Sequence, residues 1–186
     1  MYASEKVLLS RTVPEESATE LVEAAVREHA RFVYRVAYAV LRHPQEAEDA
    51  VQETFIRVWK HAREFSGILN QRAWLARIAW RVASDKRRSL PKVQITQAEL
   101  PDLPCSGVGA EQELIRAQQA QILERMVAML PADLREVFAL STVDELTSVE
   151  IAQMMSIPES TVRGRLLRAR QMLKEKIQVL LDRGRK

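Results

Sequence analysis

The sequence predicts an all-α protein made of two small helical domains joined by a flexible linker. Apolar residues recur at helical spacing along most of the 186 residues, and no stretch alternates for long in the manner of a strand. Between Ser89 and about Gly109 this periodicity disappears, while prolines and glycines gather there. A segment of that length without regular structure is uncommon inside a compact domain, so we interpret it as an interdomain linker.

Three helices are expected before the linker. The first covers about 19–42 and should end at His43-Pro44, because proline disfavours helix in the residue before it. The second covers about 44–62, with a break at Ser66-Gly67, and the third covers about 71–88. The expected buried positions are Leu21, Ala25, Phe32, Val36 and Val40, then Ala47, Val51, Phe55, Val58 and Ala62, then Leu75, Ile78, Ala79 and Val82.

After the linker, helical spacing resumes near Ala110 and continues to Pro131, followed by a short helix at about 133–140. Thr147 to Glu150 match the capping-box pattern and predict a helix at about 148–155. A turn then leads into a last helix from Pro158 to about 181, with proline suited to its first turn. The apolar stripe expected before Pro131 is Ile115, Ile122, Leu123, Met126, Val127 and Leu130.

Composition excludes several classes of protein. The chain is 47% hydrophobic and 28% charged, as in ordinary globular proteins, and no apolar run approaches the roughly 20 residues that span a bilayer. The first residues lack the features of a signal peptide, so we expect a cytoplasmic protein without membrane insertion. Cys105 and the three histidines have no metal-ligand spacing, and no phosphate loop or catalytic triad is evident. We therefore expect no enzyme activity, metal, cofactor or small-molecule substrate.

Positive charge is concentrated in two places, although the net charge is only +3. Six basic residues against one acidic residue lie between Arg72 and Arg88, and the same ratio recurs between Arg163 and Lys176. Two basic helices in a nearly balanced chain indicate two contacts with one polyanion, although charge alone would equally allow two solvated faces.

The segment 148–173 has the pattern of a helix-turn-helix, with a short helix, a tight turn and a longer basic helix. At about 100° per residue, Val162, Leu166, Ala169 and Leu173 line the buried side of the second helix. The other side should enter the major groove. The candidate DNA-binding residues are Ser160, Thr161, Arg163, Gly164, Leu167, Arg168 and Gln171.

The stretch EIAQMMSIPESTVRGRLLRAR resembles region 4 of extracytoplasmic-function (ECF) sigma factors. Gly164 replaces the serine that is usual in the family. The resemblance implies that the last helix contacts the −35 element of a promoter. The matching positions are Glu150, Ile151, Ala152, Thr161, Val162, Arg163, Arg165, Leu166, Arg168, Ala169 and Arg170.

The N-terminal half carries two more resemblances. AEDAVQETFIRVW resembles region 2.2 of the same family, which implies docking on the clamp helices of core RNA polymerase. Its exposed isoleucine among polar residues also suits a protein interface. The candidate polymerase-binding residues are Asp49, Gln52, Glu53, Ile56, Arg57 and Lys60.

RAWLARIAWRVASDKRR resembles regions 2.3 and 2.4, which implies capture of the opened −10 strand. Cations can hold the backbone while an aromatic ring stacks on a base. Ser84 is expected on the outward face, and a loop at about 65–72 corresponds to the family loop that captures a flipped base. The candidate −10 residues are Asn70, Gln71, Arg72, Trp74, Arg77, Trp80, Arg81, Arg87 and Arg88.

Together these patterns predict an ECF-type sigma factor that binds core RNA polymerase and promoter DNA, with an anti-sigma factor as a further partner implied by the resemblance. The expected organisation is an N-terminal extension (1–18), region 2 (19–89), a linker (90–113), region 4 (114–181) and a basic tail (182–186). The alternatives are a stand-alone helix-turn-helix regulator and a structural adaptor without transcription activity.

Overall fold

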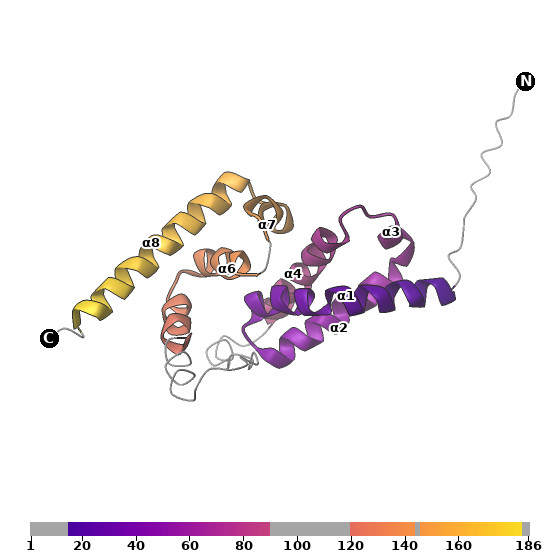
Figure 1. Cartoon of the computed structure of the whole chain (residues 1–186), viewed down its shortest axis with the longest axis horizontal. Helices are drawn as coiled ribbons and strands as arrows, with labels where there is room; N and C mark the ends of the chain where they lie inside the picture. Colours follow the sequence, from indigo (N-terminus) through magenta and orange to yellow (C-terminus); the bar gives the residue numbers. More distant parts are fainter. Residues whose placement is uncertain (1–14, 90–119, 144–145, 184–186) are drawn as a thin grey trace, which may run out of the picture.

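The computed structural model describes residues 15–89, 120–143 and 146–183, which are helical except for short turns (Figure 1). No strand occurs in these ranges, and the all-α prediction is confirmed. The predicted linker, N-terminal extension and basic tail lie wholly or largely outside the described residues. The helices are α1 (Glu15–Leu41), α2 (Pro44–Lys60), α3 (Ala62–Ser66), α4 (Gln71–Ser89), the segment 120–128, α6 (Ala132–Ser141), α7 (Ser148–Met155) and α8 (Glu159–Arg183).

The first four helices form a bundle, called here the N-terminal bundle, in which α1 packs against both α2 and α4. Its centre is built from fully buried side chains such as Val36, Val58 and Ala79. Most positions of the three predicted stripes are buried, and the predicted stripes are thus largely confirmed. Leu21, Val51 and Ile78 pack against the core but are only partly buried. Among the helices described, none combines the length and apolar character that a membrane crossing requires.

One element of the bundle differs from the prediction. The second helix ends at Lys60, and the chain turns at His61 (φ −115°, ψ 29°) before the separate short helix α3. After this turn Ala62 is buried, and Phe65 joins the core of the bundle. The apolar spacing continues through His61, so the sequence pattern did not reveal the turn.

The C-terminal unit consists of residues 120–143 and 146–183. Its helices α6 and α7 each contact α8. Met126, Val127 and Leu130 form a small core with Leu134 and with Ala169 and Leu173 of α8. Of the apolar stripe expected before Pro131, Ile115 lies outside the described residues. Ile122 and Leu123 are about half exposed, because the described packing partners meet only the end of this segment.

The helix-turn-helix begins and ends as its sequence signals predict. Thr147 Oγ1 accepts a hydrogen bond from the Glu150 amide (3.2 Å), and Glu150 Oε2 accepts one from the Thr147 amide (2.9 Å). This capping box fixes the start of α7. Ser156 ends the helix in the left-handed conformation (φ 56°), and α8 starts directly after Pro158.

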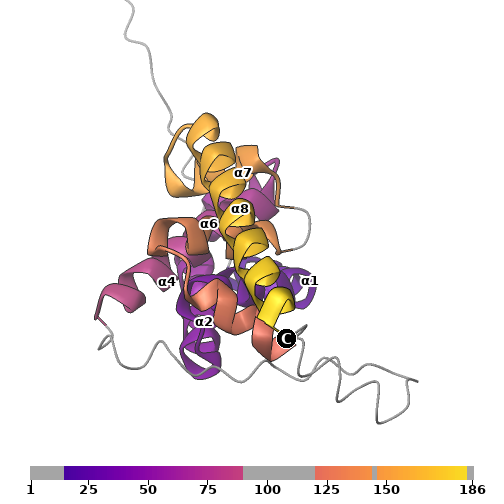
Figure 2. The same ribbon diagram turned by 90° about the vertical axis from the view of Figure 1, so that its left-hand side faces the viewer.

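The N-terminal bundle and the C-terminal unit lie next to each other along the long axis of the molecule (Figure 1), and Figure 2 views them from the α8 side. They are in contact, because α4 meets α7 and α1 meets α6. Val137, Ile151 and Val162 belong to the same hydrophobic cluster as the bundle core. One hydrophobic cluster therefore extends from the bundle into the C-terminal unit, beside the separate small core of that unit.

This contact corrects one expectation about α4. Ser84 was predicted on the outward face, but it is only 4% exposed, and its buried Oγ makes no hydrogen bond to the described residues. Trp80 and Arg87, four residues before it and three after it, both bond to Glu136 of α6. Ser84 therefore lies on a face that the C-terminal unit covers, which a helical wheel of α4 alone cannot reveal.

Candidate nucleic-acid and protein interfaces

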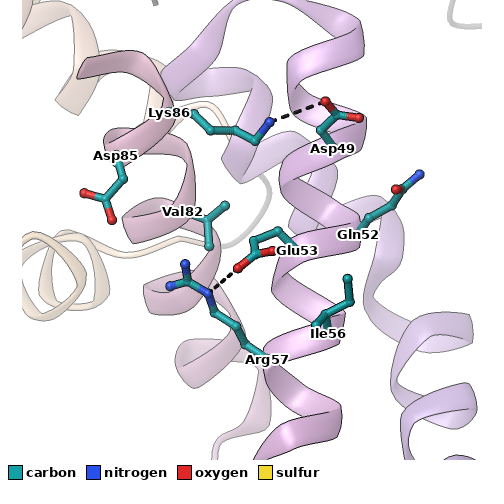
Figure 3. A pocket seen from close by; sticks show the side chains of 8 residues that line it. All are labelled: Asp49, Gln52, Glu53, Ile56, Arg57, Val82, Asp85 and Lys86. Atoms are coloured by element: carbon teal, nitrogen blue, oxygen red, sulfur yellow. Dashed lines mark hydrogen bonds and ion pairs between the residues drawn. The ribbon is translucent and has the colours of Figure 1, made fainter. Parts of the chain in front are cut away.

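A groove runs between α2 and α4 on the outside of the N-terminal bundle (Figure 3). We call it the α2–α4 groove. It brings together five of the six residues predicted to bind polymerase, whereas Lys60 is exposed on α2 outside the lining. The lining residues are Asp49, Gln52, Glu53, Ile56, Arg57, Val82, Asp85 and Lys86.

Charges in this groove are largely paired within the protein. Arg57 Nε lies 2.9 Å from Glu53 Oε1 on the next turn of α2. Lys86 Nζ lies 3.1 Å from Glu46 Oε2 and 3.4 Å from Asp49 Oδ2, which ties α4 to α2. Burial alone would lower the pKa of Lys86, but its hydrogen bonds and charge interactions with Glu46 and Asp49 raise the pKa above its ordinary value. Lys86 is therefore a cation at neutral pH.

Apolar surface lies beside these charges. Ile56 is 46% exposed and Trp59, on the next turn of α2, is 52% exposed. Sequence reasoning missed Trp59, although its i+3 spacing from Ile56 indicated the same face. It also missed Val82, Asp85 and Lys86, because the groove forms only when α4 packs beside α2. Exposed apolar and aromatic side chains with polar neighbours are typical of a protein interface.

A second hollow, the α1–α4 pocket, lies where the loop before α4 meets α1. The guanidinium of Arg72 lies 4.2 Å from the ring centroid of Phe32. Sequence reasoning missed the α1 side of this pocket, since its residues lie about 40 positions away in the chain without a local motif. The lining residues are Glu28, His29, Arg31, Phe32, Arg35, Ile68, Leu69, Asn70, Gln71 and Arg72.

Three of the predicted −10 residues have structural roles here. Asn70 Oδ1 accepts a hydrogen bond from the Ala73 amide (2.9 Å) and so caps α4. Gln71 Nε2 lies 3.5 Å from the Phe65 carbonyl oxygen. Trp74 packs on the ring of Phe65 with ring centroids 5.4 Å apart, and it is partly buried against the hydrophobic core. Their contact with DNA stays a prediction.

The remaining predicted −10 residues lie on α4. Arg81 and Arg88 are exposed, and Arg88 pairs with Asp85 at 3.0 Å. Arg77, Trp80 and Arg87 instead bond to the C-terminal unit, the last two through Glu136. The predicted set is therefore divided between an open part and a part that α6 and α7 occupy.

The predicted division of α8 into two sides is confirmed by burial. Val162, Ala169 and Leu173 are buried and Leu166 is partly buried. Leu167 is 68% exposed, so this apolar side chain is open to an external partner. On the same side Ser160, Arg163, Arg168 and Gln171 are exposed, and Thr161 and Gly164 are partly exposed.

Glu159 connects the two helices of the helix-turn-helix. Its Oε1 accepts hydrogen bonds from Ser148 Oγ of α7 (2.8 Å) and from Arg163 Nε (2.9 Å) and Nη2 (2.6 Å) of α8. The hydrogen bond from Ser148 and then that from Arg163 lower the pKa of the Glu159 carboxyl. The carboxylate is thus ionised at neutral pH and also lies in the first turn of α8, where negative charge is favourable.

No group of three or more His, Cys, Asp or Glu side chains suited to a metal ion occurs in the described ranges. The surfaces of the molecule are instead a groove with exposed apolar residues, a basic and aromatic helix, and a helix-turn-helix. This combination defines a DNA-binding transcription protein that also has a protein interface.

Comparisons with known proteins identify the family. Residues 25–92 match the family model of sigma-70 region 2, and residues 120–173 match that of sigma-70 region 4. The chain is 31% identical over 164 residues to the ECF RNA polymerase sigma-E factor of Escherichia coli, covering 82% of this chain and 86% of that protein. It is 28% identical over 157 residues to the ECF sigma factor SigW of Bacillus subtilis, covering 80% and 84%. The chain belongs to the ECF family of RNA polymerase sigma factors.

Two solved structures resemble the fold. The sigma factor RpoE of Bartonella quintana, in complex with the anti-sigma factor NepR, has a TM-score of 0.61 and 23% identity, over 84% of this chain and 96% of that chain. CnrH, in complex with the cytosolic domain of CnrY, has a TM-score of 0.56 and 21% identity, over 89% and 97%. At this level of identity the likeness concerns the fold alone.

Family membership decides between the functional hypotheses. The chain is a sigma factor that binds core RNA polymerase and directs it to promoter DNA. The comparisons do not support the alternative of a stand-alone helix-turn-helix regulator. The roles of individual residues stay predictions.

Proposed function

We propose that three separate surfaces of this sigma factor carry out its three contacts. The α2–α4 groove docks on the clamp helices of core polymerase, the α1–α4 pocket and α4 capture the opened −10 strand, and α8 reads the −35 element. Residues 19–89 would form region 2 and residues 114–181 region 4. The main support is that the groove and the outer side of α8 are both exposed, on different parts of the molecule.

The α2–α4 groove suits a helical protein partner. Its acidic residues Asp49 and Glu53 are already balanced by cations of the same protein. Little net charge therefore has to be desolvated when a partner covers the groove. Ile56 and Trp59 supply exposed apolar area, and aromatic residues are enriched in interface centres.

The α1–α4 pocket suits an unpaired nucleotide. Cationic side chains from two elements surround it, and Arg72 already lies on an aromatic ring. Asn70 and Gln71 carry amide groups at its edge that can read a base. The exposed Arg81 and Arg88 would hold the backbone next to it, and Arg77, Trp80, Arg87 and Trp74 would complete the strand path.

The outer side of α8 suits the major groove. Arg163 and Arg168 are long enough to reach guanine edges or phosphates, and Leu167 could contact a thymine methyl group. Ser160 and Thr161 at the helix start can donate to a phosphate together with the free backbone amides. Gly164 and Gln171 complete this face, and each base contact would contribute about 1–3 kcal/mol of discrimination.

The chain itself would perform no catalytic step, since nucleotide addition belongs to the polymerase. We propose a cytoplasmic location, where core polymerase acts. We also propose an anti-sigma factor as a regulator, supported by the structurally similar sigma factor RpoE, which was solved with such a partner.

Run-off transcription tests the proposed function. The purified chain and core polymerase are combined on a library of promoter fragments, and the transcripts are sequenced. We expect specific transcripts only when both are present. Failure of the chain to associate with polymerase that lacks a specificity subunit would contradict the proposal, even if α8 bound a duplex.

Two substitutions should separate the contacts. Arg168→Ala should weaken use of the −35 element by about tenfold, the effect of one lost base or phosphate contact, while core binding is unchanged. Glu53→Lys should reduce core binding and leave −35 duplex binding unchanged, since it places a cation beside Arg57 in the groove. Core binding is measured by surface plasmon resonance and duplex binding by electrophoretic mobility shift.

Matched controls exist on the same helices. Glu48→Lys makes the same charge change on α2 outside the groove, and Lys174→Ala removes a cation from α8 outside the proposed reading face. Both controls should behave like the wild type. Equal loss of both activities in Arg168→Ala or Glu53→Lys would refute the assignment of faces.

A further inference from the structure

Part of the proposed strand-binding face of α4 is occupied by the protein itself. Trp80 Nε1 donates a hydrogen bond to Glu136 Oε1 (2.7 Å), and Arg87 Nη2 donates one to Glu136 Oε2 (2.8 Å). A third residue of this face, Arg77, donates to the Gln153 carbonyl oxygen of α7 (3.1 Å). Three −10 candidates of one helix thus have partners in region 4.

Glu136 is a charged residue that is buried, which is unusual for a glutamate. It is only 8% exposed, on the helix α6 that packs against α1. A buried carboxylate needs partners for both oxygens, and here an indole N–H and a guanidinium supply them. A carboxylate held by an indole N–H and a guanidinium accepts the same hydrogen bonds that a nucleic-acid phosphate would accept from these two groups.

A second ion pair holds the two halves together away from this face. Arg42, in the turn between α1 and α2, pairs with Glu124 of the segment 120–128. Both side chains are mostly buried, at 22% exposure each. This pair involves none of the residues proposed to bind DNA, so it can be weakened without altering the strand-binding face.

The closed arrangement occupies only part of one of the three proposed surfaces, the −10 surface, whose exposed Arg81 and Arg88 stay open. The lining of the α2–α4 groove includes no residue of the C-terminal unit. The outer side of α8 is exposed, with Leu167 and Arg163 both open to solvent. Polymerase and the −35 duplex can therefore reach the closed chain, whereas the indole N–H of Trp80 and the guanidinium of Arg87 are already bonded to Glu136.

We propose that this arrangement is an autoinhibited state, in which Glu136 occupies the place of a −10 strand phosphate between Trp80 and Arg87. Region 4 must leave α4 before the strand can bind, so the free sigma factor binds the −10 strand weakly. The inference rests on the proposed role of α4 in strand capture.

The consequence for affinity is quantitative. Closure and strand binding exclude each other, so the apparent affinity for the strand is reduced by the fraction of open molecules. Removing one interdomain contact raises that fraction, and with it the affinity, even when the contact lies far from the strand.

The test measures binding of a fluorescein-labelled single-stranded oligonucleotide to the full-length free chain by fluorescence anisotropy. Its sequence is the −10 region of a promoter obtained in the run-off experiment. Glu136→Gln should increase the affinity on the order of tenfold, the effect of losing a hydrogen bond to a charged group. Glu124→Gln should also increase it, by several-fold, because it opens the same interface through Arg42.

Asp133→Asn is the control for charge. Asp133 lies on α6 like Glu136 and loses the same negative charge, but its partner is Arg165 within region 4 (3.5 Å). The affinity of the Asp133→Asn variant for the oligonucleotide should equal that of the wild type. An increase in Asp133→Asn equal to that in Glu136→Gln would overturn the proposal, because general charge repulsion would then explain both.

Unchanged affinity in Glu136→Gln and Glu124→Gln would also overturn it. Circular dichroism checks that each variant is folded, and Glu124→Gln carries the test if Glu136→Gln is not. Run-off transcription with saturating core polymerase should be the same for the wild type and Glu124→Gln. Loss of promoter-specific transcripts from the wild type would instead refute the proposed function, so the two failures are distinguishable.

Discussion

At the scale of single residues, Gly164 is the position where the recognition helix departs from the family pattern. It lies in the first half of α8, and its backbone conformation does not require glycine. A Cβ atom built there would meet only the end of the Arg168 side chain, at 4.0 Å. The glycine therefore reduces helix stability without a steric reason within the described structure.

Gly164→Ala should stabilise the protein by up to about 1 kcal/mol, the difference in helix propensity between the two residues. Gly164→Ser should give a smaller gain, because serine is a weaker helix former than alanine. The free energy of unfolding is measured by urea denaturation. If Gly164→Ala instead lowered the free energy of unfolding, another part of the protein would have to approach α8 closely at this position.

At the scale of helices, the boundaries set by local chemistry were predictable from the sequence. The capping box places the start of α7, and Pro44 and Pro158 mark the starts of α2 and α8. The turn at His61 was not predictable, since apolar spacing continues across it. Neighbouring residues in the sequence determine the hydrogen bonds that begin and end a helix. A break that allows side chains to be buried depends instead on how the neighbouring helices pack.

Thr147→Ala tests the capping box. Loss of the side-chain oxygen leaves the Glu150 amide without its partner and should cost about 1 kcal/mol of stability. Thr147→Ser keeps the oxygen and should retain most of that stability. Thermal denaturation compares the variants, and an equal loss in both would show that the methyl group, not the cap, matters here.

The candidate surfaces were predictable to different degrees for a related reason. The exposed face of α2, apart from Trp59, and the two sides of α8 follow from helical periodicity and were predicted from the sequence. His29, Arg31 and Arg35 could not be found in the same way, because they join the α1–α4 pocket only through packing. Ser84 was expected on the outward face of α4 because periodicity cannot identify which second unit covers a helix.

At the scale of the whole molecule, the hydrophobic core extends across both regions. Leu140 and Ile151 of region 4 belong to the same cluster as Val36 and Leu75 of region 2. Two units that share a core stabilise each other, so neither unfolds independently while the contact persists.

The wild type should therefore show one heat-absorption peak in differential scanning calorimetry. Glu124→Gln, which removes the Arg42 ion pair, should broaden this peak or divide it, because the two units become less dependent on each other. Two well-separated peaks in the wild type would contradict the shared core.

The shared core also limits how promoter specificity can be exchanged between relatives. A graft that replaced residues 120–183 with those of a paralogue would bring a new reading helix, but it would remove Glu124 and Glu136 from beside Arg42, Trp80 and Arg87. Such a chimera needs matched contact residues between the two units as well as a matched reading helix. Engineers who swap these modules should therefore transplant the contact residues along with the helix-turn-helix.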